Sequence, residues 1–143
     1  MIQHDTIELL RECDAGIQMG ITAIDEVKDH ATDDFQTKLD GYQREYALLQ
    51  NEMQGVLQSY HDKGKDPNPL AKGMVWLKTN MTLAVKESDA TIADLITDGC
   101  NMGVKSLNKY LNQYKAADDR AKDFAYRLIE LQDRQIKEIR RYL

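Results

Sequence analysis

The side chains that most often carry out chemistry in proteins are sparse in this chain of 143 residues. Its three histidines, His4, His30 and His61, lie near the ends of predicted helices. A carboxylate and an imidazole three residues apart lie on one face of a helix and could bind the same transition metal. No Glu-x-x-His occurs, and the residue three before His61 is Gln58. Histidines at helix ends also fit neither a Ser/His/Asp nor a Cys/His arrangement, so the sequence states no catalytic activity directly.

Charge and cysteine usage limit the compartment and the partners. The net charge of −5 is spread along the chain, and no basic stripe could neutralise successive phosphates, so we expect no nucleic acid partner. Cys13 and Cys100 lack the C-x-x-C spacing of redox and metal motifs, which fits reduced thiols. The start "MIQHDTIELL" lacks the pattern of a secretory signal, and no segment is long and apolar enough to cross a bilayer. These features predict a cytoplasmic protein without a transmembrane segment.

Apolar residues recur at helical spacing along most of the chain, and with only two prolines the composition predicts an all-α protein. The clearest pattern is a four-three alternation that predicts one long helix with a single buried seam: Phe35, Leu39, Tyr42, Tyr46, Leu49, Met53, Val56 and Tyr60. An earlier helix ends near "HATDD", where Thr32 or Asp33 can cap the next one. Pro67 and Pro69 cannot continue the long helix. We therefore predict a first helical hairpin over residues 4–62.

The second half of the chain predicts another hairpin after a connector. The segment "PLAKGMVWLKTNMTLAVK" predicts a short amphipathic helix around Trp76, within a connector of residues 63–87. Its Trp76 face is expected to pack across the bundle, and exposure of that helix would instead suit a membrane or partner surface. Ser88 or Asp89 can then cap a new helix, and two further helices complete a hairpin over residues 88–143. The whole chain, residues 1–143, is predicted to be a single domain.

Two similar phrases, "GIQMGITAI" at residues 16–24 and "GCNMGVKSL" at residues 99–107, suggest an internal repeat. Their offset of 83 also superposes Asp5-Thr6 on Ser88-Asp89, so both helices begin in the same register. We interpret the two hairpins as related. Glycine inside a helix costs about 1 kcal/mol relative to alanine, so a packing reason is expected. We expect the helices that carry these phrases to approach closely at their four glycines, Gly16, Gly20, Gly99 and Gly103.

Four further segments, "CDAGIQ", "VWLK", "IADLITDGCNMG" and "RLIELQDRQIKEI", resemble a bacterial ferritin-like family of unknown function that is related to rubrerythrins. The resemblance implies a ferritin-like four-helix bundle built from two hairpins, with an extra crossover helix between the second and third helices of the bundle. Di-iron members of that superfamily hold their metals with a Glu from each of two helices and a Glu-x-x-His from each of the other two.

This chain lacks the di-iron ligands at most of the positions where that pattern would place them. The core-facing pair of the last helix is Gln132 and Gln135, two amides where an acid and an imidazole would be expected. The acid positions of the other helices correspond to Gln18 and to Cys100 or Asn101. Amides are poor ligands for transition metals, so the resemblance implies a degenerate di-metal site. We interpret Gln132 and Gln135 as a hydrogen-bonded pair that sets the register of the bundle.

Glu45 and Glu52 are the remaining acids that could lean inward, because they flank the seam of the long helix. We interpret them as a solvated flank, since Glu is rarely buried without a partner. The sequence thus predicts a non-catalytic bundle without a cofactor that is structural or binds an unknown protein partner, with a homodimer as one possibility. The alternative is a metal-binding protein of the iron-storage or oxidase type. It would hold iron or manganese in a non-standard site: Gln18, Glu45, Glu52, Cys100, Gln132 and Gln135.

Overall fold

The computed structural model describes residues 2–60 and 88–143, and within these ranges the chain is helical and contains no strand. Four long α-helices account for most of it: α1 (Ile2–Val27), α2 (Asp33–Ser59), α4 (Asp89–Gln113) and α5 (Asp119–Glu138). Two short 3-10 helices, Lys28–His30 and Ile139–Tyr142, follow α1 and α5. The prediction of an all-α protein is confirmed for these residues. The predicted connector 63–87 with its Trp76 helix, and residues 61–62 of the first hairpin, lie outside them.

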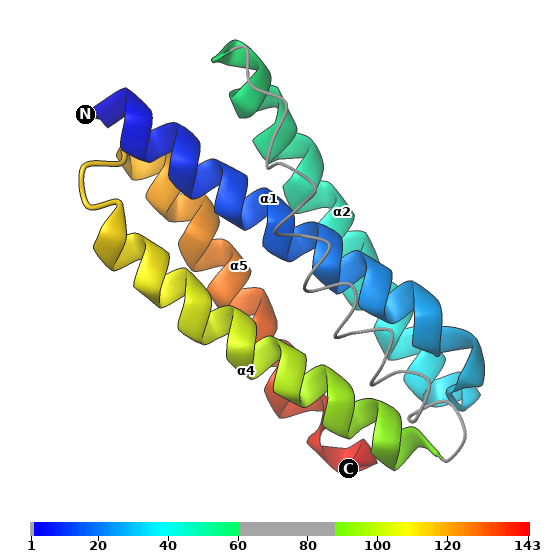
Figure 1. Cartoon of the computed structure of the whole chain (residues 1–143). Coiled ribbons are helices and arrows are strands. Elements are labelled where there is room, and N and C mark those ends of the chain that lie inside the picture. The colour runs from blue at the N-terminus through cyan, green and yellow to red at the C-terminus, as the bar shows by residue number, and fades with distance from the viewer. Residues whose placement is uncertain (1, 61–87) are drawn as a thin grey trace.

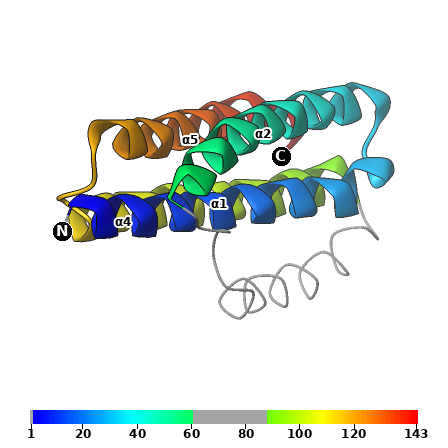
Figure 2. The same ribbon diagram turned by 90° about the horizontal axis from the view of Figure 1, so that it is seen from above.

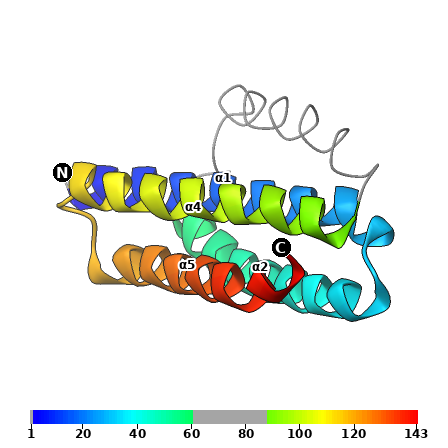
Figure 3. The ribbon, with the colours of Figure 1, turned by 90° about the horizontal axis from the view of Figure 1, so that it is seen from below.

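The four helices form two layers. Helix α1 runs antiparallel to α2, and α4 runs antiparallel to α5, as Figure 1 shows. Seen after a 90° turn, α1 and α4 make one layer and α2 and α5 make the other (Figures 2 and 3). Helices α1 and α5 consequently run in the same direction, as do α2 and α4. The end of α2 and the start of α4 therefore lie at opposite ends of the bundle.

Hydrogen bonds tie each pair of helices to the other at both ends of the bundle. Asp89, in the first turn of α4, accepts from the backbone nitrogen of Thr32 at 3.0 Å and from its hydroxyl at 2.5 Å. At the far end Thr6, near the start of α1, accepts from the backbone nitrogen of Asp118 at 2.8 Å. Thr32 does occupy the N-cap of α2, as predicted, but its side chain bonds across the bundle instead of capping its own helix. The start of α4 thus holds the loop between α1 and α2, and the start of α1 holds the loop between α4 and α5.

The core follows the apolar periodicity. Seven of the eight predicted seam residues of α2, from Phe35 to Val56, are buried, and Tyr60 at the end is half-buried. Leu9, Ile17 and Leu128 are each 0% exposed and come from α1 and α5. Each fully buried side chain of this size contributes roughly 1.5–3 kcal/mol relative to an exposed one. The packed seam explains why the four helices hold together without any disulfide among the described residues.

The glycines of the two similar phrases serve a different purpose from the one predicted. A Cβ added at Gly20 would lie 2.9 Å from Cζ of Tyr46, and one added at Gly103 would lie 2.6 Å from Oε1 of Gln132. At Gly99 an added Cβ would meet nothing within 4 Å. The expected close approach of α1 and α4 is therefore wrong for Gly99. Gly20 and Gly103 instead make room for side chains that reach up from the α2/α5 layer.

Candidate functional site

A cavity of about 300 Å³ lies between α1 and α4. Its walls carry the two similar phrases, with Gly16, Met19 and Gly20 on α1 facing Gly99, Met102 and Gly103 on α4. Tyr46 of α2 and two residues of α5, Gln132 and Gln135, line it from the other layer. The remaining lining residues belong to α1 and α4: Glu12, Ala15, Ala23, Ile24, Leu95, Ile96, Cys100, Ser106, Leu107 and Tyr110. The site is thus mostly apolar, with a few polar groups gathered on one side.

A buried hydrogen bond joins α2 to α5 at this polar side. The hydroxyl of Tyr46 donates to Oε1 of Gln135 at 2.9 Å, and both residues are 1% exposed. Burial raises the pKa of Tyr46 well above its usual value, the adjacent Cys100 thiol raises it further, and the amide of Gln132 opposes the change. The hydroxyl therefore keeps its proton and acts as a neutral donor. The predicted role of Gln135 as a register-setting polar residue fits this contact.

Cys100 and Gln132 complete the polar side of the cavity. Burial raises the pKa of Cys100 to about 12, against the opposing effect of the Tyr46 hydroxyl beside it. The thiol is therefore protonated near neutral pH, which makes it a weak nucleophile and a poor metal ligand. Gln132 is 5% exposed, and its Oε1 has no hydrogen-bond partner. The four side chains of this polar side, Tyr46, Cys100, Gln132 and Gln135, are uncharged, and Oε1 of Gln132 is buried without a partner.

The two acids proposed as possible ligands lie elsewhere. Glu45 accepts a hydrogen bond from Arg134 at 2.6 Å, and Glu52 accepts one from Arg127 at 2.7 Å, on the outer face between α2 and α5. Their side chains are 42% and 55% exposed. The interpretation of these acids as a solvated helix flank agrees with this placement.

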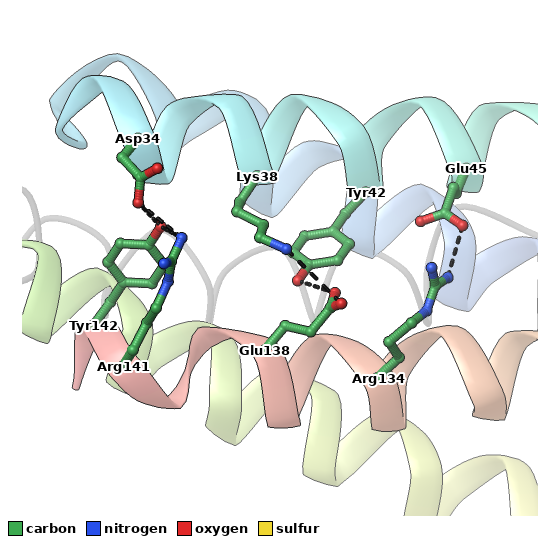
Figure 4. Close-up of polar contacts among 8 residues, drawn as sticks. All are labelled: Asp34, Lys38, Tyr42, Glu45, Arg134, Glu138, Arg141 and Tyr142. Carbon is green, nitrogen blue, oxygen red and sulfur yellow. Dashed lines mark hydrogen bonds and ion pairs between the residues drawn. The ribbon is translucent and has the colours of Figure 1, made fainter.

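Further contacts extend this outer face along α2 and the end of the chain (Figure 4). Glu138 accepts from the hydroxyl of Tyr42 at 2.7 Å and lies 3.8 Å from the ammonium of Lys38. Arg141 donates to Asp34 at 2.8 Å. We call the contacts from Asp34 to Glu52 the charged ladder. It joins the two pairs of helices with long side chains, and no part of it faces the cavity.

Gln18 belongs to a third location. Its amide donates to Asp14 at 2.9 Å, and Asp14 also accepts from Gln54 of α2 at 2.8 Å. Asp14 is 1% exposed, so two neutral amides hold a buried carboxyl group. Sequence reasoning missed Asp14, although its position four residues after Leu10, in the apolar stripe of α1, could have indicated it.

The six residues of the hypothetical metal site are therefore not assembled. Cys100, Gln132 and Gln135 meet at the cavity, while Gln18 and the two glutamates lie in two other places. Among the residues that the structure describes, no group of three or more His, Cys, Asp or Glu side chains could hold a metal ion. Iron and manganese require several anionic oxygen donors or imidazoles. Among the described residues the cavity is lined by one acid, Glu12, which interacts with the hydroxyl of Tyr110, and by no histidine. The residues present do not fit a di-metal centre.

Tyr46 is the site residue that sequence reasoning did not single out. It falls on the apolar seam of α2 and was predicted as core, which its burial confirms. The periodic pattern gives no information about where its hydroxyl points, and only the partner across the bundle, 89 residues later in the chain, reveals its role.

Comparisons with known proteins add no function to this geometry. A scan against protein-family models found no match, and searches of curated proteins and of solved structures found none either. Across the two described ranges, no helix has the length and apolar character needed to cross a membrane. The cavity and its uncharged polar side are the features of this chain that bear on its function.

Proposed function

We propose that this chain is a non-catalytic ferritin-like bundle that acts by binding rather than by metal chemistry. The observation that carries the proposal is the neutral polar side of the cavity, where Tyr46 bonds Gln135 next to Cys100 and Gln132. In a di-metal protein of this kind, carboxylates and imidazoles would project into the same region of the bundle. Here amides, a hydroxyl and a thiol fill it.

The directions of the helices support the ferritin-like part of the proposal. Ferritin-like folds contain two antiparallel pairs and one long crossover. In this chain α2 and α4 run in the same direction, so the end of α2 and the start of α4 lie at opposite ends of the bundle, as in a fold with a long crossover (Figure 1). The sequence segments that resemble the family lie partly on α1, α4 and α5 and agree with this assignment.

Charge compensation supports the non-catalytic part. A buried divalent ion is stable only where nearby anions offset its desolvation. The four polar groups at the cavity are neutral, since burial keeps the Cys100 thiol and the Tyr46 hydroxyl protonated. Both α2 glutamates of the hypothetical site are already paired with arginines on the outer face. The one acid among the described lining residues, Glu12, interacts with Tyr110, so a metal ion beside Tyr46 and Gln132 would have no adjacent counter-charge.

The partner and compartment also belong to this proposal. A cavity lined by small and apolar residues, with Met102 52% exposed, is suited to binding. Cytoplasmic location, the crossover helix in residues 63–87 and a homodimer remain predictions. Sedimentation of the purified chain at several concentrations would show whether it forms a homodimer.

Elemental analysis tests the proposal. The untagged protein is expressed in medium supplemented with iron and manganese, purified without chelator, and assayed for bound metal and for Fe(II) oxidation. We expect folded protein with far less than one metal per chain and no oxidation above the buffer rate. About two transition-metal ions per chain, the number held by di-iron bundles, would overturn the proposal.

A further inference from the structure

Leu48 is an exposed apolar side chain on the outer face that α2 and α5 form together, the α2/α5 face. It is 66% exposed, the largest exposed fraction of any bulky apolar side chain in the described parts of the chain. It lines an open hollow of about 580 Å³ between the ion pairs of Glu45 and Glu52, together with two buried leucines, Leu49 and Leu131. The hollow therefore offers an apolar floor to a side chain from outside.

Two glycines flank Leu48 on the same side of α2. Gly41 and Gly55 lie seven residues before and after it, which places all three residues on one strip of the helix. A Cβ added at either glycine would meet nothing within 4 Å, so no contact among the described residues explains the loss of about 1 kcal/mol of helix propensity at each. Gly20, in contrast, makes room for the ring of Tyr46. Glycines on an outer helix surface let another backbone approach closely, so this strip suits a helix from a second molecule.

The charges on this face are self-complementary. In the pairs of Glu45 with Arg134 and of Glu52 with Arg127, one guanidinium nitrogen donates to one carboxylate oxygen, and both groups can make further hydrogen bonds. A second copy that lays its own α2 over α5 of the first would meet opposite charge at each level of the charged ladder. The levels are Asp34 with Arg141, Lys38 with Glu138, Glu45 with Arg134, and Glu52 with Arg127. The charges therefore favour a second copy of this chain as the partner.

Two orientations can place this face against its copy, and the charges distinguish them. Helices α2 and α5 are antiparallel (Figure 1). A two-fold axis along the helices places α2 of each copy over α5 of the other, so Glu45 faces Arg134 of the second copy. An axis across the helices places α2 over α2 and brings Glu45 to the level of Glu52 of the second copy. Like charges repel in that arrangement, which favours the axis along the helices.

The extent of the face sets the expected strength of association. Helix α2 is about 27 Å long from Asp34 to Glu52, because each residue adds about 1.5 Å. With two helices about 10 Å apart, the face covers roughly 500 Å² per copy, less than the roughly 800 Å² of a standard interface. An interface of this size corresponds to a weak and reversible association.

We propose that the α2/α5 face is the interface of a weak homodimer whose two-fold axis runs along the helices, with Leu48 of each copy packed against the α5 side of the other's hollow. This inference rests on the homodimer in the proposed function and not on the absence of metal. It goes further by naming the face, the axis and the central side chain.

Sedimentation equilibrium of the full chain from micromolar to millimolar concentration tests the inference. Leu48→Lys places a cation over Arg127 and Arg134 of the second copy. Met102→Lys is the matched control, because Met102 is 52% exposed on α4, in the other layer. We expect wild type and Met102→Lys to dimerise alike, and Leu48→Lys to dimerise roughly tenfold more weakly, because like charges then oppose each other. Equal association of the two variants, or a wild-type chain that stays monomeric at millimolar concentration, would overturn the inference.

A disulfide exchange measurement tests the axis. Both native thiols are buried, so a reagent reaches only a cysteine introduced at the surface. Leu48→Cys is activated as its pyridyl disulfide and mixed with reduced Glu130→Cys or with reduced Leu48→Cys. Each rate is corrected for the reactivity of the same thiol toward a small pyridyl disulfide. Because Leu48 would lie over α5 near Glu130 of the second copy, we expect the first mixture to release pyridinethione about tenfold faster. Equal rates, or faster release from the second mixture, would overturn the axis along the helices.

The outcomes separate this inference from the proposed function. A chain that is free of metal but stays monomeric overturns the inference and leaves the non-catalytic bundle standing. A chain that holds about two metal ions overturns the non-catalytic bundle, whereas the comparison of Leu48→Lys with Met102→Lys still decides the inference.

Discussion

The pair α1 and α2 meets the pair α4 and α5 along two interfaces, α2 against α5 and α1 against α4. We call these interfaces the α2/α5 seam and the α1/α4 seam, and they are built in opposite ways. Between α2 and α5 the charged ladder spans the gap with long side chains, such as Glu45 to Arg134 (Figure 4). Glu52 and Arg127 form a further pair of the ladder. Between α1 and α4 the facing residues are small, and a cavity remains. The outer ladder is exposed, and its ion pairs line an open hollow of about 580 Å³. The space at the α1/α4 seam is more enclosed and is lined mainly by small and apolar residues, which is why we assign the binding role of the proposed function to it.

The energetic consequences of the two seams differ as well. Exposed ion pairs such as those of the ladder contribute about 0–1 kcal/mol each and weaken in salt. A buried polar group that loses its partner costs about 1–3 kcal/mol, because water cannot replace the lost contact. Changes on the cavity side should therefore have larger effects than changes in the ladder, and the following measurements test this order.

The largest effect is expected from alkaline pH through the buried thiol of Cys100. Its pKa is raised from 9.0 to about 12 in the folded chain, chiefly by burial. Between these values the unfolded chain binds fewer protons than the folded one, so the free energy of unfolding falls as pH rises, by about 1.4 kcal/mol per pH unit. Urea unfolding from pH 8 to about 11 should show a shallower decline for Cys100→Ala than for wild type. Parallel declines would place the alkaline sensitivity elsewhere.

A paired hydroxyl deletion compares the two seams directly. Tyr46→Phe leaves Oε1 of buried Gln135 without its donor and should cost about 1–3 kcal/mol of unfolding free energy. Tyr42→Phe removes a hydrogen bond to Glu138, which is 37% exposed and can bind water instead, so we expect a smaller loss. Urea unfolding of both variants at pH 7 gives the two losses. A greater loss for Tyr42→Phe would reverse the order of the seams.

Replacing two cavity-side glycines by alanine should change the stability of the protein in opposite directions. Gly20→Ala places a Cβ 2.9 Å from the ring of Tyr46, and overpacking of this kind costs about 1–3 kcal/mol. Gly99→Ala meets nothing and should gain up to about 1 kcal/mol from helix propensity. Thermal unfolding of both variants reveals the sign of each change. Stabilisation by Gly20→Ala would show that the Tyr46 ring moves aside freely.

The smallest effect on stability is expected from removing one ion pair of the charged ladder, the pair of Glu52 and Arg127. A hydrogen bond from Arg127 holds the pKa of Glu52 below its usual value of 4.5. Because the folded pKa is depressed, the stabilisation is present above the unfolded pKa and is lost as pH falls through the folded value. Glu52→Gln should therefore lower the urea midpoint slightly at pH 7, and this difference should shrink as the pH falls through the folded pKa of Glu52. One molar salt should abolish the difference at pH 7, whereas a difference that persists in salt would mean that the pair is not screened.

Much of the fold could be predicted from local patterns. The apolar periodicity identified the seam of α2 and the inward-facing pair Gln132 and Gln135, and the structure buries that pair. Residue type limited the cap of α2 to Thr32 or Asp33, and the structure has Thr32 there. These features depend on neighbours three or four residues away in the same helix. Helical geometry therefore determines them before any tertiary contact is formed.

The contacts of the candidate site could not be predicted in this way. The sequence marked Gly20 and Gly103 as unusual but not the side chains, Tyr46 and Gln132, that they accommodate. It ranked Glu45 among the possible ligands, although an arginine 89 residues later holds it on the outer face. Periodicity fixes which face of a helix is buried, but not the rotation and offset of one helix against another. For this protein the sequence by itself determined the helices and their buried faces. Only the packing of two layers decided which polar groups meet, because each meeting depends on several helices at once.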